Sequence, residues 1–262
     1  MSKGFRPGGV YLVAFAGIGA ALYYLLLWLP GIPVIGLPTL KMEIGASLAP
    51  LLGIILGPYT GALAVLIGNI AKSLYPPNLL GMLMIPCAPL SAFATAMLIR
   101  RNRWIPALIL AVILIVSLFL PPFYPLTDYD PKLGVYVWQV YLLTFFDKIA
   151  ALLLIPIALD LVTMPRSKYI GLYMLMFIGR EVDKALGCMI FALPPVYSGL
   201  FGLSLRKTRS LFIVSPLFYF IEYLFEALIA MLIAIPVIKA LLKVPGLSEI
   251  LHVKVVRDQK IL

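Results

Sequence analysis

The chain has 262 residues, of which 63% are hydrophobic and only 12% are charged. Soluble domains carry about 25% charged residues, and a single core in a chain of this size could not bury so much apolar surface. The composition therefore excludes an ordinary soluble domain and predicts an all-α, polytopic integral membrane protein surrounded by membrane lipids.

The formal net charge of +10 raises the question of a nucleic-acid partner. The basic residues, however, lie mainly at the ends of hydrophobic runs. Anionic lipid headgroups and the preference for positive charge on the cytoplasmic side account for that distribution. We therefore expect no nucleic-acid partner and a multi-pass protein of the cell membrane.

The first hydrophobic run, residues 10–29, is too long for the apolar part of a typical signal peptide and lacks a clear cleavage site. We expect it to be retained as a membrane helix. Ala16 and Ala20, four residues apart, place small side chains on one face of this helix. That face either packs inside the protein or docks to another subunit.

The next stretch mixes turn signals with apolar runs. Residues 30–41 are rich in proline and glycine, which predicts an ordered loop or a loop that dips into the headgroup region. Residues 42–74 are apolar but are interrupted at Gly57-Pro58, and each half is short for a membrane span. The pattern therefore predicts a tight helical hairpin about Gly57.

A turn at residues 75–78 precedes the next span, residues 79–99, which we expect to be kinked at Pro86 and Pro89. The densest short basic cluster follows directly and is predicted to be cytoplasmic; it consists of Arg100, Arg101 and Arg103.

The rest of the chain alternates apolar runs with polar connections. Residues 121–132 are aromatic and proline-rich, which is typical of an external loop with tyrosines at the interface. Four further spans are predicted, at residues 104–120, 135–162, 169–195 and 211–242.

The pattern contains eight hydrophobic segments, so we expect about six to eight transmembrane helices and cytoplasmic termini. One basic cluster conflicts with this topology, because Arg206, Lys207 and Arg209 fall on the external side. Either the rule is broken there, or residues 196–210 re-enter the membrane. We treat residues 1–262 as a single transmembrane domain with a front half, residues 1–103, and a charged-helix half, residues 104–262.

Ionisable residues lie in the middle of three predicted spans of the second half, where each charge costs about 2.5–3.5 kcal/mol. They are Asp147, Lys148, Arg180, Glu181, Asp183, Lys184, Glu222 and Glu226. Three interpretations remain open: an ion-pair network that locks the helices together, a binding site for a polar or cationic small molecule or ion, and a proton path. Glu222 and Glu226, four residues apart, favour a bound cation because two stacked carboxylates would repel each other.

The sequence lacks the residues that several kinds of metal, cofactor and catalytic site require. Cys87 and Cys188 lie in apolar runs and are expected to be small buried hydrophobes, and the one histidine, His252, lies in a polar tail. We therefore expect no metal site and no cofactor. The motifs of serine hydrolases, zinc proteases and P-loop ATPases are missing, and the last helix has no deep lysine for retinal, so we expect no enzyme.

Residues 29–75 carry a resemblance to a known family. A proline-rich loop is followed by an apolar stretch that contains G-P-x-x-G-A, here Gly57, Pro58, Gly61 and Ala62. In this, and in the small residues four apart on the first helix, the chain resembles the substrate-binding S components of energy-coupling factor transporters. The resemblance covers about the first quarter of the chain.

The resemblance implies a small helical bundle that captures a vitamin-like compound or a metal ion from outside, with residues 30–41 as a lid. Ala16 and Ala20 would dock the transmembrane T component, and partner ATPases would supply energy. Candidate substrate-binding residues at the external end are Lys41, Glu43, Asn69, Tyr75, Asn78, Trp138, Gln139 and Tyr141. From the charged helices we add Asp147, Glu222 and Glu226, and we expect Lys148, Arg180, Glu181, Asp183 and Lys184 to form a buried charge network.

The chain departs from the family in two respects: the usual bundle has six helices, and the N-terminus here has no histidine, which makes nickel or cobalt an unexpected substrate. The alternative is a non-catalytic structural or accessory membrane subunit of a larger complex. The sequence leaves both functions open.

Overall fold

A computed structural model describes residues 8–34, 37–244 and 251–259. It is 76% helical, which confirms the all-α class. The helices are α1 (Gly8–Leu26), α2 (Ala49–Leu56), α3 (Pro58–Leu74), α4 (Leu79–Leu83), α5 (Cys87–Ile99), α6 (Trp104–Ser117), α7 (Val137–Leu161), α8 (Lys168–Phe191), α9 (Leu205–Lys243) and α11 (Val253–Asp258). The short elements are β1 (Gly31–Val34), β2 (Leu37–Glu43), the 3-10 helix η1 (Ile44–Leu48), β3 (Tyr129–Asp130), β4 (Val135–Tyr136) and the π-helix η2 (Pro195–Leu200).

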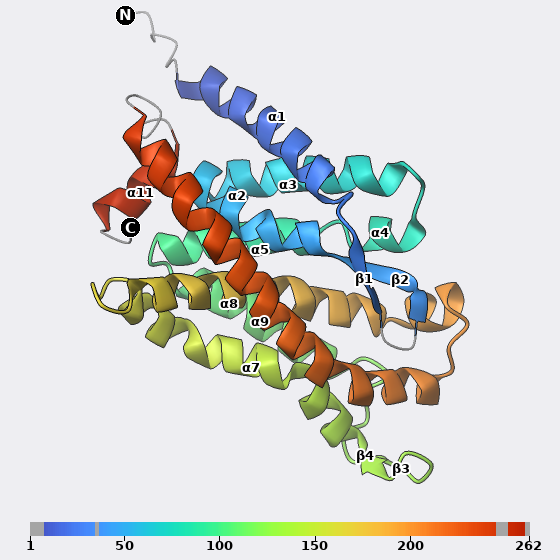
Figure 1. The fold of residues 1–262 in the computed structure, drawn as a ribbon. Helices are drawn as coiled ribbons and strands as arrows, with labels where there is room; N and C mark the ends of the chain where they lie inside the picture. The colour runs from blue at the N-terminus through green and yellow to red at the C-terminus, as the bar shows by residue number, and fades with distance from the viewer. Residues whose placement is uncertain (1–7, 35–36, 245–250, 260–262) are drawn as a thin grey trace, which may run out of the picture.

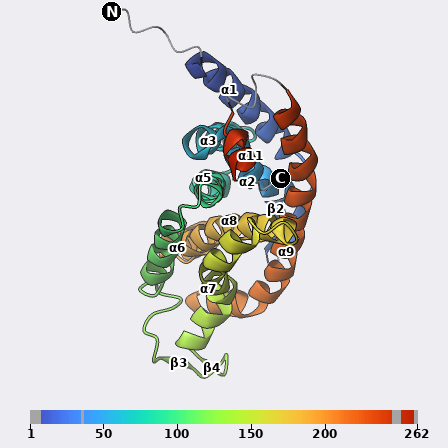
Figure 2. The same ribbon diagram turned by 90° about the vertical axis from the view of Figure 1, so that its left-hand side faces the viewer.

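The helices lie side by side in one elongated bundle (Figure 1). Viewed along the bundle, α1, α3, α5, α8 and α7 follow one another, with α6 on one side and α9 on the other (Figure 2). The strands gather at one end of the bundle, which we call the hairpin end. The start of α1 and the C-terminal helix α11 lie at the other end, which we call the terminal end.

Four helical stretches are long and apolar enough to cross a membrane: Gly9–Leu26, Leu79–Ile99, Val137–Leu161 and Leu205–Lys243. These support the prediction of a membrane protein with transmembrane helices. The larger count of six to eight spans and the cytoplasmic placement of the termini stay predictions.

The proline-rich segment is a β-hairpin rather than a loop. β1 and β2 pair antiparallel, with Gly31 opposite Glu43 and Pro33 opposite Lys41; residues 35 and 36, between the strands, lie outside the described residues. Proline disfavours a helical conformation of the residue before it and cannot donate the hydrogen bond of a helix interior. A two-stranded ribbon tolerates proline because each strand has a free edge.

The predicted helical hairpin is confirmed at Gly57, which connects α2 to α3 with a φ of 88° that suits glycine. Pro58 then begins α3 at a position where the missing N–H costs nothing. A Cβ at Gly61 would lie 2.7 Å from the Leu52 carbonyl oxygen, so glycine also allows the two helices to touch. The predicted kink near Pro86 is a break between α4 and α5.

The conflicting basic cluster lies at the hairpin end, in the first turns of α9. Aspartates of the loop between α6 and α7 pair with it: Arg206 Nε lies 3.5 Å and Arg209 Nη1 3.8 Å from the Asp130 carboxylate. Arg209 Nε also donates to the Pro122 carbonyl at 3.1 Å. Ion pairing with this loop explains why the fold accommodates the cluster at this end.

The described part of the C-terminal tail is packed against the bundle rather than solvated. The His252 N–H donates to the Ile55 carbonyl at 2.9 Å, and its Nδ1 lies 3.1 Å from the Ile54 carbonyl. Arg100 Nε donates to His252 Nε2 at 2.7 Å. The histidine therefore accepts at Nε2 and donates at Nδ1, which requires the neutral ring.

Gly53→Ala tests the packing of α2 on α5. The added methyl group would lie 2.0 Å from the Ala92 carbonyl oxygen, so the helices must separate at a cost of about 1–3 kcal/mol. We expect a lower midpoint of thermal unfolding in detergent. Gly17→Ala is the matched control, because no described atom lies within 4 Å of its Cβ position. Equal midpoints for the two variants would contradict this packing.

The C-terminal segment is expected to be released by acid. Burial lowers the pKa of His252 below 6.5, a shift that the hydrogen bond to Ile54 opposes and the Arg100 charge reinforces. A lowered pKa stabilises docking fully above pH 6.5, and this contribution is lost as the pH falls through the lowered value. Hydrogen exchange of α11 should rise in that range. His252→Gln should remove this pH dependence, and retention of it would contradict the role of the histidine.

Candidate functional site

Arg180 of α8 is the centre of a buried ion-pair group. Its side chain is 0% exposed, and its Nε and Nη2 donate to Glu226 Oε2 of α9 at 3.0 and 2.6 Å. Its Nη1 donates to the Ala46 carbonyl of η1 at 3.1 Å and to the Asp183 carboxylate. One guanidinium thus ties α8, α9 and the end of the β-hairpin together.

A second group joins α7 to α8. Lys148 Nζ donates to Asp147 Oδ2 at 2.7 Å and lies 3.7 Å from Glu181 Oε2. All three side chains are almost fully buried. Both Glu181 oxygens are buried and accept no hydrogen bond from any described group. Lys148 therefore carries most of the polar contact between the two helices.

This arrangement bears on the cation that we expected between Glu222 and Glu226. Arg180 lies against Glu226, so the protein itself supplies the positive charge beside that carboxylate. The sequence could not show this, because Arg180 and Glu226 are brought together only by the packing of α8 on α9.

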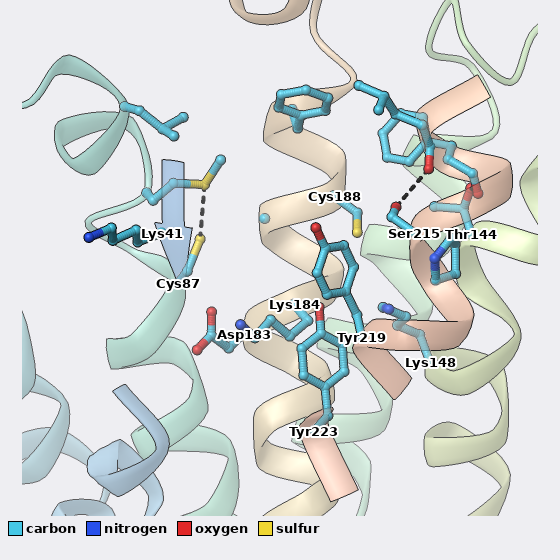
Figure 3. Close-up of a pocket in the computed structure, with 17 residues that line it drawn as sticks. Lys41, Cys87, Thr144, Lys148, Asp183, Lys184, Cys188, Ser215, Tyr219 and Tyr223 are labelled. Carbon is cyan, nitrogen blue, oxygen red and sulfur yellow. Dashed lines mark hydrogen bonds between the residues drawn. The ribbon is translucent and has the colours of Figure 1, made fainter. Parts of the chain in front are cut away.

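Two adjoining cavities open beside these charges, towards the hairpin end. Figure 3 shows the residues that line the first of them. The first, about 270 Å³, lies among α5, α7, α8 and α9, and the second, about 230 Å³, lies among β2, α3, α4, α5 and α8. Side chains common to both linings are Lys41, Leu80, Met84, Cys87, Asp183 and Lys184. The shared wall makes the two cavities neighbouring parts of one candidate site.

The first cavity has an aromatic wall on α9. Tyr219 and Tyr223 stack with ring centroids 6.1 Å apart and planes 18° apart. The ammonium groups of Lys184 and Lys148 lie 4.7 and 5.3 Å from the centroid of the Tyr223 ring, within the range of cation–π attraction. Figure 3 shows both lysines close to these two tyrosines.

The second cavity is more polar and includes four of the predicted ligand residues, Lys41, Glu43, Asn69 and Asn78. Asn69 already donates to the Ile85 carbonyl at 3.1 Å, and Asn78 caps α4 by accepting from the Gly81 N–H at 3.1 Å. Burial raises the pKa of the Glu43 carboxyl, and the nearby Lys72 charge opposes that shift.

The other predicted ligand residues lie outside both cavity linings. Tyr75 and Trp138 are exposed, Gln139 accepts from the Tyr136 N–H at the start of α7, and Tyr141 donates to the Leu114 carbonyl. These assignments stay predictions outside the two cavities, since a position at the external end does not fix the direction of a side chain. Asp147, Glu222 and Glu226 also lie outside the linings, whereas Lys148, Arg180, Asp183 and Lys184 line them and Glu181 does not.

Several lining residues escaped prediction, among them Thr144, Cys188, Phe212, Ser215, Tyr219 and Tyr223. The repeat of Tyr219 and Tyr223 at the spacing of one helical turn, beside Glu222, was the available signal. Such a repeat is equally typical of a lipid-facing or core stripe, so it does not by itself identify a cavity.

Ala16 and Ala20, which we assigned to partner docking, lie on a face of α1 that another part of this chain covers. Both are buried within the chain, at 7% and 5% exposure. A Cβ at Gly68 would lie 3.0 Å from the Ala20 carbonyl oxygen, which shows how closely α3 approaches this face of α1. The small residues therefore pack α1 on its own neighbour.

Comparisons with protein-family models, with curated proteins and with solved structures return no match. The resemblance to S components thus depends on the residues of the first quarter alone. Among the described residues, no group of three or more His, Cys, Asp or Glu side chains is placed to hold a metal ion. The two cavities are therefore the features of this structure that point to a function.

Glu226→Gln tests the buried ion-pair group. Removing this charge leaves Arg180 buried with only Asp183 as a charged partner, and breaking a buried pair costs about 3–5 kcal/mol. We expect a clearly lower thermal midpoint in detergent. Glu222→Gln, one turn earlier on α9, is the matched control and should have a smaller effect. The reverse order of the two variants would contradict the assigned pairing.

Proposed function

We propose that this chain is the membrane-embedded substrate-capture subunit of an importer for a small, vitamin-like solute. The observation that carries the proposal is the pair of adjoining cavities inside the helical bundle, near the hairpin end. Pockets that bind small molecules are concave, largely apolar and furnished with a few placed polar groups. The first cavity fits that description through its aromatic wall and its lysines.

The β-hairpin supports the capture role. Lys41 of β2 lines both cavities, so the hairpin forms part of the site. β2 runs directly into η1, whose Ala46 carbonyl accepts from Arg180. Contacts made at the hairpin are therefore connected to the charged helices, as the lid role of residues 30–41 requires.

The energy for import would come from partner subunits. The sequence contains no P-loop, so ATPase subunits and a transmembrane T component complete the proposed machine, as the resemblance to S components implies. In this proposal the chain crosses the cell membrane six to eight times, both termini are cytoplasmic, and the hairpin end is external. The chain itself performs no chemistry.

The alternative is a non-catalytic accessory subunit of a larger membrane complex. The observation that favours it is the apolar outer face of α1, where Val13, Ile18 and Leu25 are more than half exposed. Lipid covers such a face in a membrane protein, and a partner helix would do so equally well.

Native mass spectrometry of the protein, extracted gently from its own membrane, separates the two functions. The importer proposal predicts a bound solute of a few hundred daltons and co-extraction of ATPase and T-type subunits. A ligand-free chain held in fixed ratio to membrane subunits without an ATPase would overturn the importer proposal and support the accessory role.

A further inference from the structure

We propose that the substrate is a planar organic anion that lies against Tyr219 with its charged group towards Lys184 and Lys41. This inference depends on the capture function proposed above and names the class of solute. It replaces the cationic solute that the sequence suggested, because the charges that face the cavities have the opposite sign.

Among the described residues, cationic side chains outnumber carboxylates in the two linings. The cations are Lys41, Lys72, Lys148, Arg180 and Lys184, and the carboxylates are Glu43 and Asp183. An anion entering from the hairpin end would meet this excess of positive charge in a site with apolar walls, where charge attraction is stronger than in water.

Two carboxylates of the charged helices pair with these cations from outside the cavity linings. Asp147 accepts from Lys148 and Glu226 accepts from Arg180, and neither acid contributes to a cavity lining. Each acid therefore holds in place a cation that belongs to a cavity lining. A cationic solute would reach these acids only by displacing the lysine or the arginine.

The aromatic wall selects the shape. Phe191, Phe212, Tyr219 and Tyr223 all line the first cavity. Tyr223 is buried and has two ammonium groups near its ring, and Tyr219 stacks on it and also lines the first cavity (Figure 3). A flat ring stacked on Tyr219 would place a carboxylate or phosphate on its edge near the lysines.

The two cysteines of the chain supply a built-in probe, because Cys87 and Cys188 both line the first cavity. A thiolate attacks a methanethiosulfonate at its sulfenyl sulfur, which forms a mixed disulfide and releases methanesulfinate. The sulfonatoethyl reagent is negative and the trimethylammonioethyl reagent is positive. The ratio of their rates, divided by the same ratio for a small thiol in solution, reports the sign of the local field.

The first test measures binding of 2-naphthoate and of 2-naphthylmethylammonium to the purified chain by thermal shift in detergent. Naphthoate should raise the unfolding midpoint in a saturable manner, and the ammonium probe should not. Lys41→Gln and Lys184→Gln should each weaken naphthoate binding about tenfold, as expected for a lost charged contact. Lys132→Gln, an exposed lysine outside both linings, is the matched control and should bind like wild type.

The second test uses the thiol reagents and does not depend on the stability of a variant. The negative reagent should modify the native cysteines several-fold faster than the solution ratio predicts, and Cys87→Ser with Cys188→Ser should abolish labelling. A preference for the positive reagent, or no reaction with either, would overturn the proposal.

The outcomes also distinguish a failure of the anionic substrate class from a failure of the proposed capture function. Saturable binding of the ammonium probe, with no effect of naphthoate, would refute the anionic class and leave the capture function standing. Binding of neither probe, together with no co-extracted solute, would refute both. Equal binding of naphthoate and acetate would refute the planar ring and retain the anion.

Discussion

The burial of one guanidinium determines much of this structure. Arg180 is the largest fully buried side chain in the described part of the chain. A charge at that depth persists only where acceptors surround it, since an unpaired buried ion costs several kcal/mol. Glu226, Asp183 and the Ala46 carbonyl are these acceptors. They come from α9, α8 and η1, so satisfying a single side chain fixes how three elements meet.

The need to pair buried cations with acids also determines which charges line the two cavities. A buried lysine or arginine needs a carboxylate partner, and Lys148 and Arg180, which line the cavities, are each paired with an acid that does not. The acids that lower the free-energy cost of burying these cations therefore form a second layer, outside the cavity linings. An anionic solute would give these cations a further negative partner from inside the cavity. A cationic solute would instead compete with them for their carboxylates.

Prediction from the sequence succeeded where local chemistry decides the outcome. Gly57-Pro58 could only connect two helices, and ionisable groups in apolar runs had to be buried together. It failed where the answer depends on which face meets which. Ala16 and Ala20 offer the same small surface to α3 as to a partner. The pairing of Glu226 with Arg180 likewise depends on helix register, which no local pattern records.

The first cavity lies where α9 contains a proline. Pro216 lies inside α9, which bends in its first part (Figure 1), and Pro216 has no N–H to donate to the Phe212 carbonyl. The hydroxyl of Thr144, on α7, lies 3.3 Å from that freed oxygen, although it bonds more closely, at 2.7 Å, to a carbonyl one turn earlier in its own helix. Ser215 bonds back to the Leu211 carbonyl at 2.7 Å, a contact that often bends helices further. All five residues line the first cavity, so the cavity lies beside the bent part of α9, where that helix meets α7 and α8.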